Sequence, residues 1–230
     1  MWGGIIRAFW PKVALALTVS IGISSQAFAI NVARSDILLH IVSQCVDPSK
    51  ANYCSQCMLP RRDANCGVSE CKKTNEVWAL NTQYAAIRDI KMCGCPAEFV
   101  HGLAMPREVI TGVEDLNRQE GIWQFAWDVA TERIELDSIA LVVNPKSQRT
   151  QNQLHIHLLR LDKNARANFS QYAPSYVNSL ENIWAIAEKD ARSKGLNDYG
   201  VLVAQQSPGK YIVVVMPNSP EAAFTQWSCN

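Results

Sequence analysis

The sequence predicts an α+β fold in which helices pack on one face of an antiparallel sheet. Apolar residues recur at helical spacing in two segments, 121–135 and 180–193. Short apolar runs typical of β-strands lie at 76–80, 84–90, 99–105, 140–143, 154–161, 201–205 and 211–215. Because the segments between most of these runs are short, we expect consecutive strands to pair antiparallel, which places the chain in the α+β class.

The first 29 residues have the three-part layout of a secretory signal. Arg7 and Lys12 precede an apolar run, 13–23, and Ala27-Phe28-Ala29 supplies the small residues of a cleavage site. The run is about half as long as the roughly 20 residues that a membrane-spanning helix needs. We expect export to the periplasm with cleavage after Ala29, which leaves residues 30–230 as a single domain. An uncleaved leader would instead anchor this domain in the inner membrane.

The mature chain is expected to open with a helix within 30–46, capped by Ser35 or Asp36. Its apolar residues at helical spacing are Ile37, Leu38, Ile41 and Val42. Residues 47–96 are cysteine-rich, and the polar part up to residue 75 has too few apolar residues to bury a core unaided. We interpret this stretch as an insertion or subdomain stapled by its cysteines.

The eight cysteines are interpreted first as disulfides. They are Cys45, Cys54, Cys57, Cys66, Cys71, Cys93, Cys95 and Cys229. An even count behind an export signal favours disulfides, although the sequence does not fix their pairing. The alternative is a structural zinc ion, because the spacing of Cys54 and Cys57 suits a metal and Cys93 and Cys95 could complete a tetrahedral site.

Turn-forming and helix-ending residues delimit the later elements. Asn81-Thr82-Gln83 predicts a hairpin turn, and Pro106 ends the strand before it. Gly195 ends the second long helix, and Ser207-Pro208-Gly209 predicts the turn of a final hairpin.

The charge balance argues against nucleic acid as a partner. The formal net charge is only +1, whereas proteins that bind phosphate backbones carry a clear excess of basic residues. A single small phosphorylated substrate, held by a few donors, remains compatible with this balance.

Gln153, His155 and His157 alternate along the predicted strand 154–161 and the residue before it. Because residues two apart on a strand point to the same side, these three form a polar row opposite the apolar Leu154, Ile156 and Leu158. Three interpretations are open: a solvent-facing strand, a His-x-His metal pair, or a nucleophilic imidazole supported by its neighbour.

The loop before the histidines favours the third interpretation. Residues 144–152, Asn-Pro-Lys-Ser-Gln-Arg-Thr-Gln-Asn, are crowded with amide, hydroxyl and cationic donors that suit phosphate oxygens. A nucleophile beside clustered phosphate donors is the equipment for attack at phosphorus.

The run NPKSQRTQNQLHIHLLRLD resembles the active-site strand of the histidine-triad superfamily and, more narrowly, of bacterial CDP-diacylglycerol pyrophosphatases. The stretches GLAMPREVITGVED, GIWQFAWDVA and YGVLVAQQSPGKYIVVV, with the late Cys229, are similar to the same family. The resemblance covers roughly residues 97–229, whereas 47–96 matches poorly. It implies a histidine-triad-like fold and hydrolysis of CDP-diacylglycerol at a membrane surface, without a cofactor or metal, through a covalent nucleotidyl-histidine.

The resemblance also implies roles for individual residues. It places the nucleophile at His155 and the third histidine position at His157, with Gln153 standing where the family pattern has its first histidine. A register shifted by two would make His157 the nucleophile and leave Leu159 as the third residue. Asn144 matches the residue that orients the catalytic strand, and the positions expected near phosphate are Ser147, Arg149, Thr150 and Gln151.

Two alternatives and one further histidine complete the sequence analysis. The chain could hydrolyse other nucleotide pyrophosphates, or it could be an exported, non-catalytic protein that binds nucleotide or lipid and is stabilised by disulfides or zinc. His101 lies on the strand before Pro106, where it could approach the site, but we interpret it as a partly buried histidine whose polar atoms have their partners elsewhere in the protein.

Overall fold

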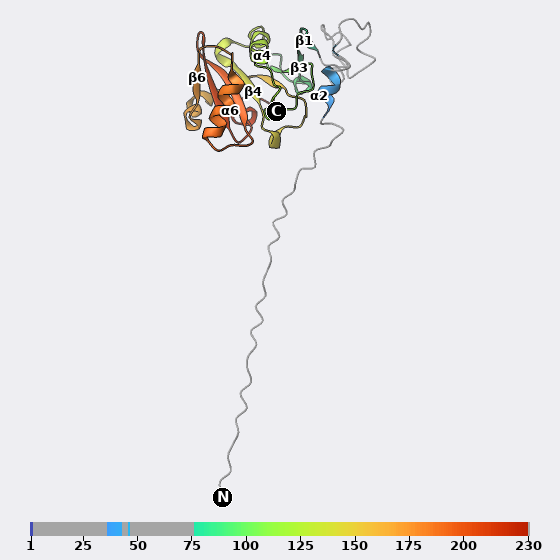
Figure 1. Ribbon diagram of the computed structural model, residues 1–230. Helices are drawn as coiled ribbons and strands as arrows, with labels where there is room; N and C mark the ends of the chain where they lie inside the picture. Colours follow the sequence, from blue (N-terminus) through green and yellow to red (C-terminus); the bar gives the residue numbers. More distant parts are fainter. Residues whose placement is uncertain (2–35, 43–45, 47–75, 230) are drawn as a thin grey trace.

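The structure, a computed structural model, describes Met1 and residues 36–42, 46 and 76–229 (Figure 1). Its described part contains an eight-stranded antiparallel sheet in the order β1-β2-β3-β5-β4-β7-β8-β6. The strands are β1 (Val77–Leu80), β2 (Tyr84–Arg88), β3 (His101–Pro106), β4 (Ile139–Val143), β5 (Ile156–Arg160), β6 (Ser175–Val177), β7 (Gly200–Ser207) and β8 (Lys210–Met216). The predicted α+β class is confirmed.

Both long helices form close to where their apolar spacing predicted them. The helices are α2 (Ile37–His40), α4 (Gly121–Thr131), α5 (Ala165–Asn168), α6 (Ile183–Ser193) and α7 (Pro220–Phe224), and the short 3₁₀ segments are η3 (Ile90–Met92), η4 (Leu136–Ser138), η5 (Lys146–Gln148) and η6 (Phe169–Tyr172). Neither α7 nor the short edge strand β6 was predicted, because each is too short to show a periodic pattern.

One face of the sheet is covered by α4 and α6, which form the main core. Trp123 of α4 and Trp184 of α6 are both buried, with ring centroids 4.7 Å apart. They pack with alternate residues of the strands, among them Leu141, Ile156 and Leu158. The tryptophans are therefore core residues, as their helical spacing indicated.

The expectation that helices cover only one face is wrong. On the opposite face α2 packs over β1, β2 and β3, with Leu38 against residues such as Leu103, whereas Phe224 of α7 packs over β4, β7 and β8. Figure 1 shows α2 beside the β1–β3 end of the sheet. Of the helices on this second face, α2 lies within the helix predicted for 30–46, whereas α5 and α7, with four and five residues, are too short for helical periodicity to reveal them from the sequence.

A gap between these two apolar clusters holds polar side chains. In the sheet register His157 of β5 lies between Leu103 of β3 and Val142 of β4. Residues opposite one another on antiparallel strands point to the same face. Leu103 belongs to the cluster under α2 and Val142 to the cluster under α7, so His157 lies at the boundary between the two.

The chain end is tied to the segment after β2 by a disulfide between Cys95 and Cys229. Cys93 is also disulfide-bonded. The zinc alternative is therefore wrong for Cys93 and Cys95, because a sulfur in a disulfide has no thiolate to offer a metal. Cys54 and Cys57, most of the cysteine-rich stretch and nearly all of the predicted leader lie outside the described residues.

Among the described residues, no helix has the length and apolar character needed to cross a bilayer.

The disulfide between Cys95 and Cys229 is expected to stabilise the fold, because it joins residues separated by 134 positions in the chain. Replacing both cysteines by serine should lower the free energy of unfolding by about 2–5 kcal/mol, the usual cost of losing such a crosslink. Urea unfolding of the wild type and of the Cys95→Ser/Cys229→Ser variant measures this difference. Equal values would mean that packing of α7 alone holds the chain end.

Candidate active site

His155 and His157 lie side by side on the second face of the sheet, with ring centroids 4.7 Å apart. His157 belongs to β5, a central strand between β3 and β4, and His155 immediately precedes it. Both side chains are buried. The strand begins at Ile156, two residues later than predicted, yet the two imidazoles still share one face.

The hydrogen bond of His155 fixes which ring nitrogen carries its proton. Nδ1 lies 2.8 Å from the main-chain carbonyl oxygen of Gln153, which can only accept, so Nδ1–H donates. Burial lowers the pKa of His155, which keeps the ring neutral near pH 7. Nε2 therefore carries a free electron pair, as a nucleophilic imidazole requires.

His157 connects three neighbours. Its Nδ1 lies 2.9 Å from Nε2 of His101, and its Nε2 lies 3.4 Å from Nδ2 of Asn144 and 3.5 Å from Oε2 of Glu221. Burial, with smaller contributions from His155 and His101, holds the pKa of His157 well below the ordinary value of a histidine. Both ring nitrogens are thus held by polar partners, which fixes the ring beside His155.

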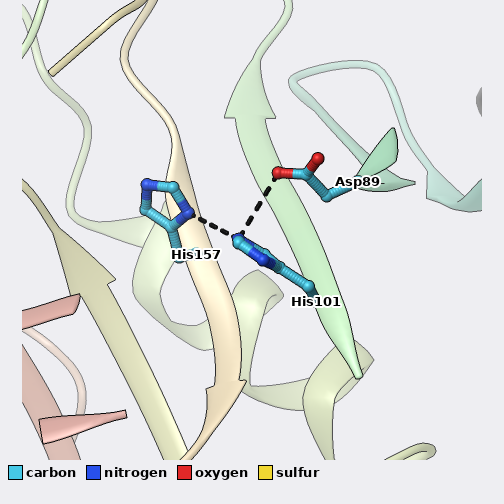
Figure 2. A group of neighbouring side chains, drawn as sticks. All are labelled: Asp89, His101 and His157. Carbon is cyan, nitrogen blue, oxygen red and sulfur yellow. Dashed lines mark hydrogen bonds and ion pairs between the residues drawn. The ribbon is translucent and has the colours of Figure 1, made fainter. Parts of the chain in front are cut away.

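His101 belongs to the same cluster, as Figure 2 shows. Its side chain projects from β3, is fully buried, and places Nε2 3.4 Å from Oδ2 of Asp89 and 3.7 Å from Oε1 of Glu221. Burial lowers the pKa of His101 to about 3 and raises the pKa of the Asp89 carboxyl. His101 is therefore fully and not partly buried, and it does approach the site, since its partners are the polar groups there.

Glu221 is a site residue that the sequence analysis missed. It is buried on α7, where Oε2 accepts a 2.5 Å hydrogen bond from Nδ2 of Asn144 and Oε1 accepts one of 3.0 Å from Nζ of Lys91. Ser219 caps α7 by accepting from the N–H of Ala222, and its hydroxyl donates to Oδ1 of Asn144. Ser-Pro-Glu is a helix-start pattern, so the sequence carried a signal for α7 but none for the direction of this carboxylate.

The side-chain amide of Gln153 makes its hydrogen bonds to the main chain. Its Nε2 donates to the main-chain oxygens of Pro106, at 2.9 Å, and of Glu108, at 2.7 Å. Gln153 therefore fastens the chain leaving β3 to the segment before β5. Its contact with His155 is made by the main chain, not by the amide.

The loop residues expected near phosphate take different positions. Thr150 and Gln151 line a cavity together with His155 and His157. Arg149 lines a small space beside His155 and pairs with Glu114 at 2.5 Å. Ser147 is exposed and lies in neither space, and its main-chain N–H donates to Asp198.

Asp89, His101 and His157 could also hold a metal ion. Each offers one ligand atom, and these atoms lie within 4.8 Å of one another. Two imidazoles and a carboxylate suit zinc. The ammonium group of Lys91, 3.0 Å from Glu221, opposes a further cation at this place. The donor set alone leaves both a hydrogen-bonded and a metal-bound cluster open.

Burial of neutral imidazoles should make the protein less stable in acid. Below pH 6.5 His101 binds a proton in the unfolded chain, whereas in the folded protein it binds one only near pH 3. The free energy of unfolding therefore falls as the pH is lowered through this window. The raised pKa of Asp89 acts in the opposite direction and offsets part of the loss. At pH 5 the contribution of His101 alone is about 2 kcal/mol.

Unfolding by urea at pH 7 and pH 5 measures this effect. His101→Gln should reduce the difference between the two pH values, whereas His40→Gln, on the exposed side of α2, serves as the matched control. An unchanged pH dependence in His101→Gln would contradict the assignment.

Comparison with known proteins identifies the family of the chain. No curated protein matches the chain. The model of the CDP-diacylglycerol pyrophosphatase family matches residues 33–189, which is more than half of the chain. The matched range also spans residues 47–96, for which the sequence motifs showed little resemblance. Because the match also contains Asp89, His101, Asn144, His155 and His157, the chain belongs to the CDP-diacylglycerol pyrophosphatase family, whose members are hydrolases.

Proposed function

We propose that this protein hydrolyses CDP-diacylglycerol to CMP and phosphatidate through a covalent nucleotidyl-His155. The observation that carries the proposal is the hydrogen bond from Nδ1 of His155 to the main-chain oxygen of Gln153. It leaves Nε2 with a free electron pair on a neutral, buried ring that lines a cavity. Membership of the family supports the overall reaction.

The proposed reaction has two steps. Nε2 of His155 attacks the phosphorus on the cytidine side, a nitrogen–phosphorus bond forms, and the bond to the bridging oxygen breaks with release of phosphatidate. Water then attacks the same phosphorus, which releases CMP and restores the free imidazole. Positioning and neutralisation of charge supply most of the acceleration in such transfers.

In this proposal His157 and its partners position the reacting group. Asn144 and Glu221 hold one side of the His157 ring and His101 holds the other, so the ring lies fixed beside the nucleophile. His101 provides a third imidazole, which the family pattern places at the position of Gln153. Gln153 itself contributes the main-chain acceptor that orients His155.

The setting proposed for this reaction is the periplasmic surface of the inner membrane. The leader-like residues 1–29 support export, and a lipid substrate requires contact with a bilayer. The alternation of histidines and the preceding polar loop support a histidine-triad-like fold for the described sheet.

His155→Ala should abolish turnover of CDP-diacylglycerol, with kcat falling by about three orders of magnitude or more because the covalent route is lost. His157→Ala should reduce kcat less, since it removes a positioning group. With substrate labelled in the cytidylyl phosphate, rapid acid-free quenching should trap label on the wild-type chain and none on His155→Ala. Exposed His40→Ala is the matched control. Label that survives in His155→Ala but disappears in His157→Ala would place the nucleophile two residues later.

The proposed chemistry needs no metal, so prolonged dialysis against EDTA should leave kcat unchanged. The competing outcome is specific: stoichiometric zinc in the isolated protein, loss of activity on chelation and recovery on adding zinc. That result would assign Asp89, His101 and His157 as ligands instead of a hydrogen-bonded cluster. Circular dichroism before and after dialysis distinguishes a loss of the site from unfolding.

A further inference from the structure

A cavity of about 240 Å³ lies against the two histidines on the side facing α2. It is enclosed by α2, by β2 and the segment after it, by β3, and by the loop before β5. The proposed mechanism uses only the two histidines that line this cavity and gives no role to its other residues.

The cavity is divided chemically. Its apolar wall consists of Ile37, Leu38, Ile41, Ile87, Ile90 and Leu103. Its histidine wall carries His155 and His157 with Asp89, Thr150 and Gln151. A water-soluble nucleotide has no group that suits six aliphatic side chains. An amphiphile with an ester or hydrocarbon part beside a phosphate suits both walls.

The polar loop before β5, residues 144–152, holds α2 in place over this cavity. Oε1 of Gln151 accepts from the main-chain N–H of Leu38 at 3.4 Å, and Nδ2 of Asn152 donates to Oδ1 of Asp36 at 2.9 Å. Leu38 is buried against the strands, whereas Ile90 is 43% exposed at the rim. The apolar wall is therefore a fixed part of the site and opens to the surface at Ile90.

One cation lines the cavity. Lys91 is 41% exposed in its side chain, and its Nζ binds Oε1 of Glu221 at 3.0 Å. Lys91 follows Ile90 in the chain and therefore lies between the apolar wall and the histidine wall. A lysine ammonium is a natural partner for a phosphate group.

We infer that this cavity binds the phosphatidyl half of the substrate, with the first acyl carbons against the α2 wall and the lipid-side phosphate at Lys91. The inference rests on the proposed function. The volume equals about eight water molecules, which accommodates this portion of the lipid and leaves the remaining acyl chains outside.

The test measures binding of dihexanoylphosphatidate, a water-soluble form of the lipid product, to the full chain by titration calorimetry. Ile37→Asn and Ile90→Asn introduce a polar group at half-buried and exposed positions of the wall, which spares the core. Both should weaken binding about tenfold or more, because the acyl carbons lose their apolar partners. Leu136→Asn, at a 50% exposed leucine outside the cavity, is the matched control and should bind like the wild type.

Glycerol 3-phosphate is the second ligand, since it carries the phosphate without the acyl chains. The affinity of the protein for glycerol 3-phosphate should be unaffected by Ile37→Asn and Ile90→Asn. Lys91→Met should lower the affinity for both glycerol 3-phosphate and dihexanoylphosphatidate. If the two isoleucine variants bind dihexanoylphosphatidate as the wild type does, or weaken both ligands equally, the inference is overturned.

The same measurement separates this inference from the proposed function. His155→Ala should abolish turnover, yet Ile37→Asn and Ile90→Asn placed in the His155→Ala background should still weaken binding of dihexanoylphosphatidate, because the apolar wall does not depend on the nucleophile. If the wild-type chain binds dihexanoylphosphatidate, loses this binding in Ile37→Asn and Ile90→Asn, and yet shows no turnover of CDP-diacylglycerol, the lipid site is sustained and the catalytic proposal is refuted. If the wild-type chain turns over CDP-diacylglycerol but the two isoleucine variants bind dihexanoylphosphatidate as the wild type does, the catalytic proposal is sustained and the lipid site is refuted.

Discussion

Burial of three imidazoles on one face of the sheet is the constraint on which the rest of the site depends. Away from water, each ring of His101, His155 and His157 stays neutral, and its polar atoms need partners inside the protein. The main-chain oxygen of Gln153 meets this need for His155, whereas His101 and His157 bind each other. Asp89 and Glu221 lie near the same ring nitrogen of His101, Nε2, that faces His157. The orientation of each ring therefore depends on groups from β3, β4, β5 and α7 together.

The end of the chain completes this arrangement. Glu221 reaches the histidines only because α7 packs closely on β7, where a Cβ atom at Gly200 would lie 2.4 Å from Cδ of Pro220. The hydroxyl of Ser219 both caps α7 and binds Asn144, and the disulfide of Cys229 joins the residues beyond α7 to the segment that carries Lys91. These separate contacts direct one buried carboxylate, so the C-terminal segment is part of the site and not an appendage to the sheet.

The sequence was sufficient for the elements whose side chains follow a regular period. The spacing of Trp123 and Trp127 predicted α4, and the polar residues between apolar runs predicted both hairpins. The alternation of His155 and His157 also predicted their common face. Asp89 and Glu221 escaped prediction because a carboxylate next to a short element is exposed in most proteins, and only the packing of distant segments shows that these two are buried. His101 was misread for the same reason: its partner His157 is 56 residues away in the chain.

Gln153 illustrates how the local bonding at a position selects a residue type. Its Nε2 group donates to two main-chain oxygens, those of Pro106 and Glu108, which lie where the chain leaves β3. An amide group has two N–H donors, whereas a neutral imidazole has one and could satisfy only one of these oxygens. A glutamine is therefore better suited than a histidine to this junction. Because His101 places a third imidazole next to His157, the site holds three imidazoles although position 153 is a glutamine. The third ring comes from β3, where its neighbours are carboxylates, instead of from the segment that leads into β5.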